Sequence, residues 1–129
     1  MSDPVLFVGH SLVGITMPDM LAALLPTTQI DAQSINGASS AYNWDNGATA
    51  QGVDARDLLP SGDCATLILT EAFPLADAIA GVGTHGAAEN DASRAWDANP
   101  DTRVLIYETW DDVTNPKAFR VALTADLAL

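Results

Sequence analysis

The residues with the clearest chemical potential lie near the N-terminus, in the stretch FVGHSLVG at residues 7–14. Ser11 follows a short apolar run and a glycine, a pattern that predicts a serine presented on a turn where a strand ends. Such a hydroxyl can attack an acyl carbon, but it needs a base because it is a poor nucleophile at neutral pH. We therefore take Ser11 as the candidate nucleophile, and capping of the first helix as the structural alternative.

Two known serine and glycine motifs do not fit this stretch. A phosphate-binding loop requires a lysine after its second glycine, whereas Gly14 is followed by Ile15 and Thr16. The nucleophile elbow of α/β-hydrolases requires a glycine two residues after the serine, where this chain has Val13. That elbow also lies well inside its domain, whereas Ser11 follows the first predicted strand.

The elements that must position Ser11 can be predicted from apolar runs and turn residues. Short apolar runs bounded by turn signals predict strands covered on both faces, and helical patterns separate them. Alternation of strands and helices predicts a three-layer α/β/α sandwich with a parallel sheet of about four strands. The predicted strands are 5–8, 29–35, 66–69 and 103–107; the predicted helices are 18–25, 87–98 and 116–129; and 39–47 and 79–86 are predicted to be loops.

With these elements in place, the sequence resembles the SGNH, or GDSL-type, superfamily of esterases and lipases. In that superfamily the serine directly follows the N-terminal strand, as in VLFVGHSL, and His10 stands where the GDSL form has aspartate. A glycine after strand two, which helps to bind the oxyanion, has its counterpart in the pair Asn36 and Gly37. The resemblance implies hydrolysis of a small acyl or carbohydrate ester through an acyl-serine, with the N–H groups of Ser11 and Gly37 holding the oxyanion.

The sequence departs from that pattern in two places. The third block, Gly-x-Asn-Asp, is replaced by Thr70, Glu71 and Ala72. An ionised Glu71 would repel an oxyanion, so that at the site it must be protonated, orient another group or bind substrate. The family's Asp-x-x-His pair has no counterpart either, and the helical pattern runs to Leu129 without a residue that would end it. We therefore expect residues 1–129 to be the N-terminal portion of a longer single domain, with little or no activity as given.

Other polar residues are expected at the same rim of the sheet, because ligands bind beyond the carboxyl ends of parallel strands. For Glu71 the structural alternative is a carboxylate that interacts with a helix N-terminus, and for Gly37 it is a simple turn. The aspartates 91, 97 and 101 are expected on a solvated face, and His85 on the surface, while Trp96 is expected to anchor the core. The predicted rim residues are His10, Asn36, Asn43, Glu71 and Glu108.

Composition narrows the remaining classes of function. The formal net charge of -12 argues against nucleic acid or an anionic membrane as a partner, because both would repel the chain. Cys64 is the only cysteine, so no internal disulfide is expected, and no spacing predicts a metal or a cofactor. No signal peptide or membrane helix is recognisable, which favours a cytoplasmic protein. The alternative functions are a non-catalytic flavodoxin-like module for a small polar ligand and a degenerate hydrolase kept for protein contacts, such as a homo-oligomer.

Overall fold

The structure is a computed structural model that describes residues 3–72, 75–81 and 83–107. Strands and helices alternate along most of this length, as the apolar runs and helical patterns predict. In chain order the elements are β1 (Val5–Gly9), α1 (Thr16–Leu24), β2 (Ile30–Ser34), α2 (Ser40–Asn46), the 3-10 helix η1 (Gly47–Thr49), β3 (Gln51–Gly52), α3 (Ala55–Leu58), the 3-10 helix η2 (Leu59–Ser61), β4 (Thr66–Leu69), α4 (Leu75–Gly81), α5 (Thr84–Ala98) and β5 (Arg103–Ile106).

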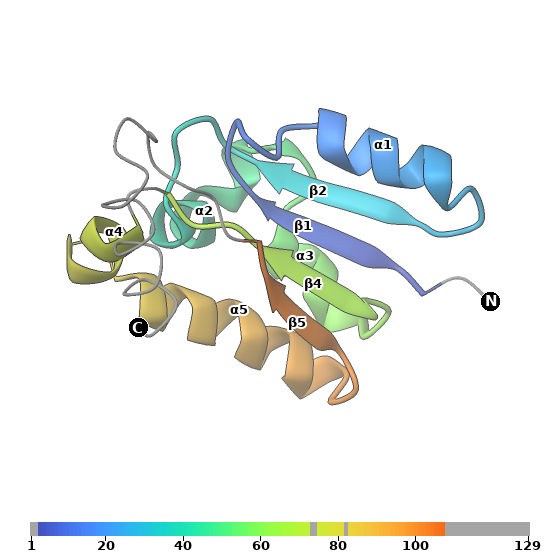
Figure 1. Cartoon of the computed structure of the whole chain (residues 1–129). Helices are drawn as coiled ribbons and strands as arrows, with labels where there is room; N and C mark the ends of the chain where they lie inside the picture. The colour runs from blue at the N-terminus through green and yellow to red at the C-terminus, as the bar shows by residue number, and fades with distance from the viewer. Residues whose placement is uncertain (1–2, 73–74, 82, 108–129) are drawn as a thin grey trace, which may run out of the picture.

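The strands form one five-stranded sheet in the order β3-β2-β1-β4-β5. β1 is central and pairs in parallel with β2 and β4, so that Val5 lies opposite Ile30 on one side and Thr66 on the other. β5 extends the parallel sheet beyond β4, and only the two-residue β3 runs antiparallel. All four predicted strands are thus confirmed, although β1 is one residue longer than predicted, β2 is one residue shorter at each end, and β5 ends one residue earlier. The carboxyl ends of the parallel strands point to the same side of the molecule, where α2 and α4 lie (Figure 1).

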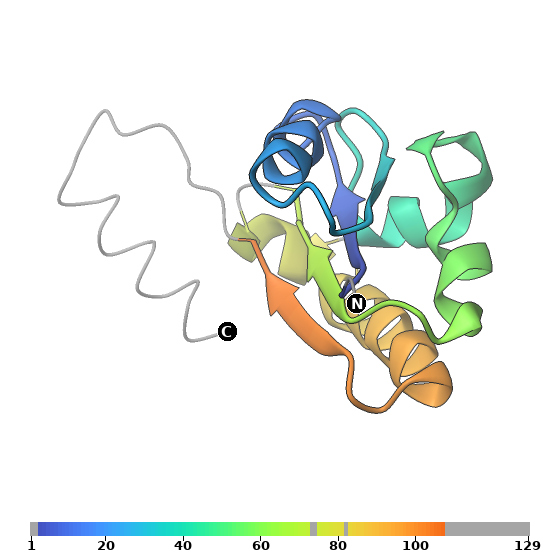
Figure 2. The ribbon, with the colours of Figure 1, turned by 90° about the vertical axis from the view of Figure 1, so that its right-hand side faces the viewer.

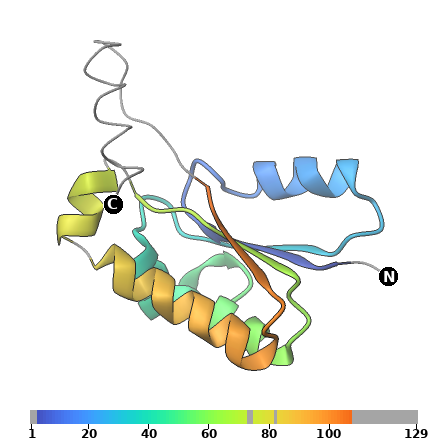
Figure 3. The ribbon, with the colours of Figure 1, turned by 60° about the horizontal axis from the view of Figure 1, so that its bottom comes forward.

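Helices cover both faces of this sheet. α1 lies on one face, whereas α2, α3 and α5 lie on the other (Figure 3), and the view in Figure 2 shows α1 and α5 on opposite sides of the strands. This arrangement confirms the predicted α/β class with helical layers around a mostly parallel sheet. None of the helices that the structure describes has the length and hydropathy of a membrane-spanning segment.

The main core lies between the sheet and the helices α3 and α5. Alternate residues of β1 and β4 face it, because side chains of a strand point in turn to opposite faces. Small alanine side chains let α5 approach the strands closely. The buried cluster consists of Leu6, Val8, Ala55, Leu59, Cys64, Leu67, Leu69 and Ala95. Cys64 is thus a buried free thiol within this core.

Both predicted loops are wrong. Residues 39–47 contain α2, whose first turn is capped by Ser39, since its hydroxyl accepts a hydrogen bond from the Tyr42 amide at 3.1 Å. The glycine-rich stretch 79–86 is divided between α4 and α5, and Gly83 separates them with a φ of 75°. Helix propensity alone does not reveal these helices, because glycine and asparagine in their sequences favour turns.

Burial also differs from expectation at two helix positions. Asp91, expected in solvent, is 1% exposed, whereas Trp96, expected in the core, is 47% exposed. The Trp96 indole instead donates a hydrogen bond to the Thr102 carbonyl oxygen at 2.8 Å. In α1 the buried residue is Pro18, whereas the apolar side chain of Met20 lies largely in solvent. The spacing of apolar residues in the sequence locates these helices, but it does not show which side of each helix faces the sheet. The predicted helix at 116–129 lies outside the described residues.

Candidate functional site

Ser11 lies on a tight turn at the carboxyl end of β1. The turn forms because the carbonyl oxygen of His10 accepts hydrogen bonds from the amides of Val13 and Gly14, at 3.0 and 2.8 Å. Before the turn, a Cβ on Gly9 would lie 3.0 Å from the Cβ of Thr70, so that the close approach of β1 to the end of β4 favours glycine. Ser11 is left exposed at the turn. It does not cap α1, whose N-cap residue is Ile15.

The His10 side chain fixes this turn to the end of β4. It is buried, and its Nε2 lies 3.0 Å from the carbonyl oxygen of Glu71, while its Nδ1 accepts a hydrogen bond from the Leu12 amide at 3.3 Å. Both contacts are satisfied when Nε2 carries the hydrogen and Nδ1 is the acceptor. Since both ring nitrogens are engaged in this way, His10 orients the Ser11 turn and does not serve as the base for Ser11.

Gly37 brings a second backbone donor to the same place. It lies in the loop between β2 and α2 with a φ of 72°, a backbone conformation that glycine adopts without strain. Ser11 and Gly37 together line a pocket of about 280 Å³, with His10 and Ala72 completing its lining among the described residues. Neither the amide of Ser11 nor that of Gly37 forms a hydrogen bond with another described residue. Both amides are therefore available to a ligand.

Behind the pocket, the Glu71 carboxylate connects three segments of the chain. Its Oε1 accepts hydrogen bonds from the amides of Ser40 and Ala72, at 2.8 and 2.6 Å. Its Oε2 accepts a hydrogen bond from the hydroxyl of Thr84 at 2.7 Å. Glu71 is 7% exposed and is not among the residues that line the pocket. Of the three roles expected for Glu71, orienting other groups is the one that matches this geometry.

Asn43 lies beneath the pocket and forms part of a buried amide network. Its Nδ2 donates hydrogen bonds to the carbonyl oxygens of Gly9 and Ser39, at 3.1 and 3.3 Å. Its Oδ1 accepts one from Nε2 of Gln33 at 3.0 Å, and Oε1 of Gln33 accepts one from the Ala55 amide at 2.7 Å. Asn43 is 0% exposed. It therefore ties α2 to the end of β1 and cannot contact a ligand.

The predicted rim residues thus separate into three groups. His10 lines the pocket with Ser11 and Gly37, whereas Glu71 and Asn43 support it from behind. Asn36 is exposed beside Gly37 but does not line the pocket, and Glu108 lies outside the described residues.

Three residues at or behind the site were not predicted from the sequence: Gln33, Ala72 and Thr84. Gln33 carried a weak signal, as a polar side chain inside a predicted strand. Ala72 and Thr84 carried no signal in their type or spacing.

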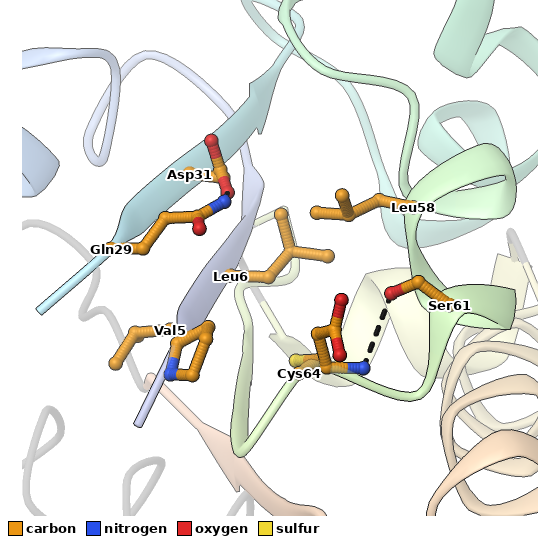
Figure 4. A pocket seen from close by; sticks show the side chains of 9 residues that line it. Val5, Leu6, Gln29, Asp31, Leu58, Ser61 and Cys64 are labelled. Carbon is orange, nitrogen blue, oxygen red and sulfur yellow. Dashed lines mark hydrogen bonds between the residues drawn. The ribbon is translucent and has the colours of Figure 1, made fainter. Parts of the chain in front are cut away.

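A second, smaller pocket lies at the opposite end of the sheet (Figure 4). It has a volume of about 110 Å³ and is lined from the amino ends of β1 and β2 and from the segment before β4. Cys64 lies in its wall, and burial raises the pKa of this thiol, so that the reactive thiolate is disfavoured. Asp31 already accepts a hydrogen bond from Gln29 at 2.7 Å. Within the described ranges, no group of three or more histidine, cysteine and acidic side chains is arranged to hold a metal ion.

A scan against protein-family models and searches of curated proteins and of solved structures each found no match for the chain. Its function must therefore be inferred from the pocket itself.

Proposed function

We propose that the pocket at Ser11 is the acyl site of an SGNH-type serine ester hydrolase that acts on a small acyl or carbohydrate ester. One observation carries the proposal: Ser11, which is exposed, and Gly37 come from different loops and line the same pocket. Donors fixed in place before the reaction stabilise the charge that develops on a carbonyl oxygen, without reorganisation during the reaction. A hydroxyl nucleophile beside two such N–H groups is the minimum arrangement for acyl transfer.

The reaction would proceed in two steps. Ser11 Oγ forms a bond to the carbonyl carbon and loses its proton to solvent water, while the N–H groups of Ser11 and Gly37 hold the oxyanion. The bond to the alcohol then breaks, the alcohol leaves with a proton, and water releases the acid from the acyl-serine. No hydrogen bond joins the Ser11 hydroxyl to the ring of His10, whose two nitrogens contact the Glu71 carbonyl oxygen and the Leu12 amide. We therefore expect acylation of this chain to be slow, since an unassisted serine hydroxyl is a weak nucleophile.

Charge further restricts the class of substrate. With a formal net charge of -12, the chain repels strongly anionic molecules. Neutral or cationic esters are therefore favoured over esters of polyanions. The affinity for a neutral ester should depend little on salt, because no net charge is brought to the surface.

Hydrolysis of p-nitrophenyl acetate tests the proposal. The unmodified chain should release p-nitrophenol faster than the Ser11→Ala variant. The Ser93→Ala variant, which changes an exposed serine on α5, should match the unmodified chain. Equal rates for all three proteins, with folding shown to be intact by circular dichroism, would refute a nucleophilic role for Ser11.

A second candidate is a non-catalytic module that binds a small carboxylate or similar anion. The observation that favours it is the engagement of both ring nitrogens of His10, so that none of the described residues that line the pocket is placed as a base for Ser11. Two N–H groups and a hydroxyl suit the oxygens of a carboxylate as well as an oxyanion. Saturable binding of acetate that is weakened in Ser11→Ala, together with no ester turnover, would favour this candidate over the hydrolase.

A further inference from the structure

Glu71 occupies the point where three loops of the site meet. Its own carbonyl oxygen contacts the His10 ring, and its carboxylate receives hydrogen bonds from the start of α2 and the start of α5. Ser40, the donor in α2, follows Gly37 by three residues. Glu71 is thus linked both to the turn that presents Ser11 and to the loop that presents the Gly37 amide.

We propose that Glu71 is a positioning residue, whose carboxylate acts as a hydrogen-bond acceptor that holds the Gly37 loop against the Ser11 turn. The inference rests on the proposed function, because the consequence of this positioning is the spacing of the two oxyanion donors. Glu71 is not a catalytic residue, since it is 7% exposed and only the following residue, Ala72, lines the pocket.

The hydrogen bonds identify what the carboxylate does. Two amides and one hydroxyl donate to its two oxygens. An ionised carboxylate accepts hydrogen bonds and donates none, so three donors suit it fully. Bonds of this charge-assisted kind are about twice as strong as those between neutral groups.

Two substitutions separate positioning from direct participation. In Glu71→Gln the amide oxygen can still accept from the amides of Ser40 and Ala72, and its NH₂ group can donate to the Thr84 hydroxyl oxygen. In Glu71→Ala all three donors lose their acceptor. Glu89→Ala is the matched control, because Glu89 is an exposed glutamate of α5.

The assay is the rate at which a fluorophosphonate probe labels Ser11 in the full chain, corrected for the folded fraction. We expect Glu71→Ala to label about 100-fold more slowly, because a displacement of about 1 Å has an effect of that order. Glu71→Gln should retain the rate to within about 5-fold, and Glu89→Ala should be unchanged. If Glu71→Ala does not fold, Thr84→Val replaces it. That variant removes only the Oε2 donor, and we expect it to slow labelling about 3-fold to 10-fold, as for the loss of one net hydrogen bond of about 1 kcal/mol.

Each other outcome overturns a defined part of the inference. Equal loss in Glu71→Gln and Glu71→Ala would show that the charge of Glu71, not its acceptor role, matters. No loss in Glu71→Ala, or in Thr84→Val where that variant replaces it, would show that Glu71 does not position the site. If the unmodified chain shows no labelling that depends on Ser11, the proposed function fails. Hydrogen exchange of the Ser40 amide, which donates to Glu71, then tests the positioning role alone. Exchange of this amide should match in Glu71→Gln and in the control, and it should be faster in Glu71→Ala or Thr84→Val.

Discussion

Asp91 provides a test of the packing between α5 and the elements beneath it. The side chain is 1% exposed, and its Oδ2 has no hydrogen-bond partner in the structure. Burial raises the pKa of Asp91 from 3.8 to about 7, although the nearby Arg56 opposes this shift. The folded protein therefore retains the Asp91 proton up to a pH near 7, whereas the unfolded chain loses it near its ordinary pKa. As a result, the free energy of unfolding should fall as the pH rises through this window.

The size of the effect follows from the two pKa values. A difference between 3.8 and about 7 corresponds to about 4 kcal/mol between the two protonation states. Between pH 5 and pH 8, the free energy of unfolding should fall by about 2.5 kcal/mol of this amount. This pH range lies above the isoelectric point of about 4.1. Asp91→Asn has no proton to release over that range. Its free energy of unfolding, relative to that of the unmodified chain, should therefore rise by about 2.5 kcal/mol between pH 5 and pH 8. This is a large part of the typical stability of a domain, which is about 5–15 kcal/mol.

Urea unfolding, followed by tryptophan fluorescence at pH 5, 6, 7 and 8, measures this gain. Asp97→Asn is the control, because it removes an exposed carboxylate from the same helix. We expect its difference from the unmodified chain to stay within about 0.5 kcal/mol at every pH. If the difference for Asp91→Asn were also independent of pH, the reasoning about the buried carboxyl would be refuted.

Three further predictions concern residues around the two pockets. Asn43→Ala should lower the free energy of unfolding by about 3 kcal/mol in urea titrations, because it leaves the buried Gly9 carbonyl oxygen without the Asn43 donor. An unchanged midpoint of urea unfolding would contradict a stabilising role for the amide network. Gly37→Ala should lower the free energy of unfolding by about 1–2 kcal/mol, because the φ of 72° disfavours a side chain. By contrast, Gly86→Ala should raise the free energy of unfolding by about 0.5–1 kcal/mol, because Gly86 lies in a helix and no atom lies within 4 Å of the added Cβ. Cys64 should react with iodoacetamide at pH 8 at least about 10-fold more slowly in the native protein than in urea, since burial raises its pKa and restricts access; equal rates would contradict that burial.

The sheet could be predicted from the sequence because its strands are short apolar runs with clear ends. β1 and β4 show this best, since both are buried on two faces and are followed by polar residues at the rim. The short β3 could not be predicted, since two exposed residues carry no periodicity. α2 was missed because its serine, asparagine and aspartate residues favour turns, and packing against α5 outweighs that preference.

The structure brings two of the predicted site residues, Ser11 and Gly37, to one pocket, whereas most side-chain contacts behind that pocket could not be predicted from the sequence. Ser11 and Gly37 could be placed together because each follows a parallel strand, and such ends lie at one rim. The partners of Glu71 could not be predicted, because Ser40 and Thr84 are 31 and 13 residues away in sequence and meet it only through tertiary packing. The burial of Asp91 was missed for a similar reason, since an aspartate in an acidic chain is usually exposed.

Labelling of the full chain with a fluorophosphonate, read by intact mass and by peptide mapping, tests the central claim most directly. It requires no knowledge of the natural ester. Because an unassisted serine hydroxyl is a weak nucleophile, we expect slow labelling of at most one probe per chain, located on Ser11, with labelling abolished in Ser11→Ala and unchanged in Ser93→Ala. No adduct, or an adduct that persists in Ser11→Ala, would contradict the claim that Ser11 is the nucleophile of this pocket.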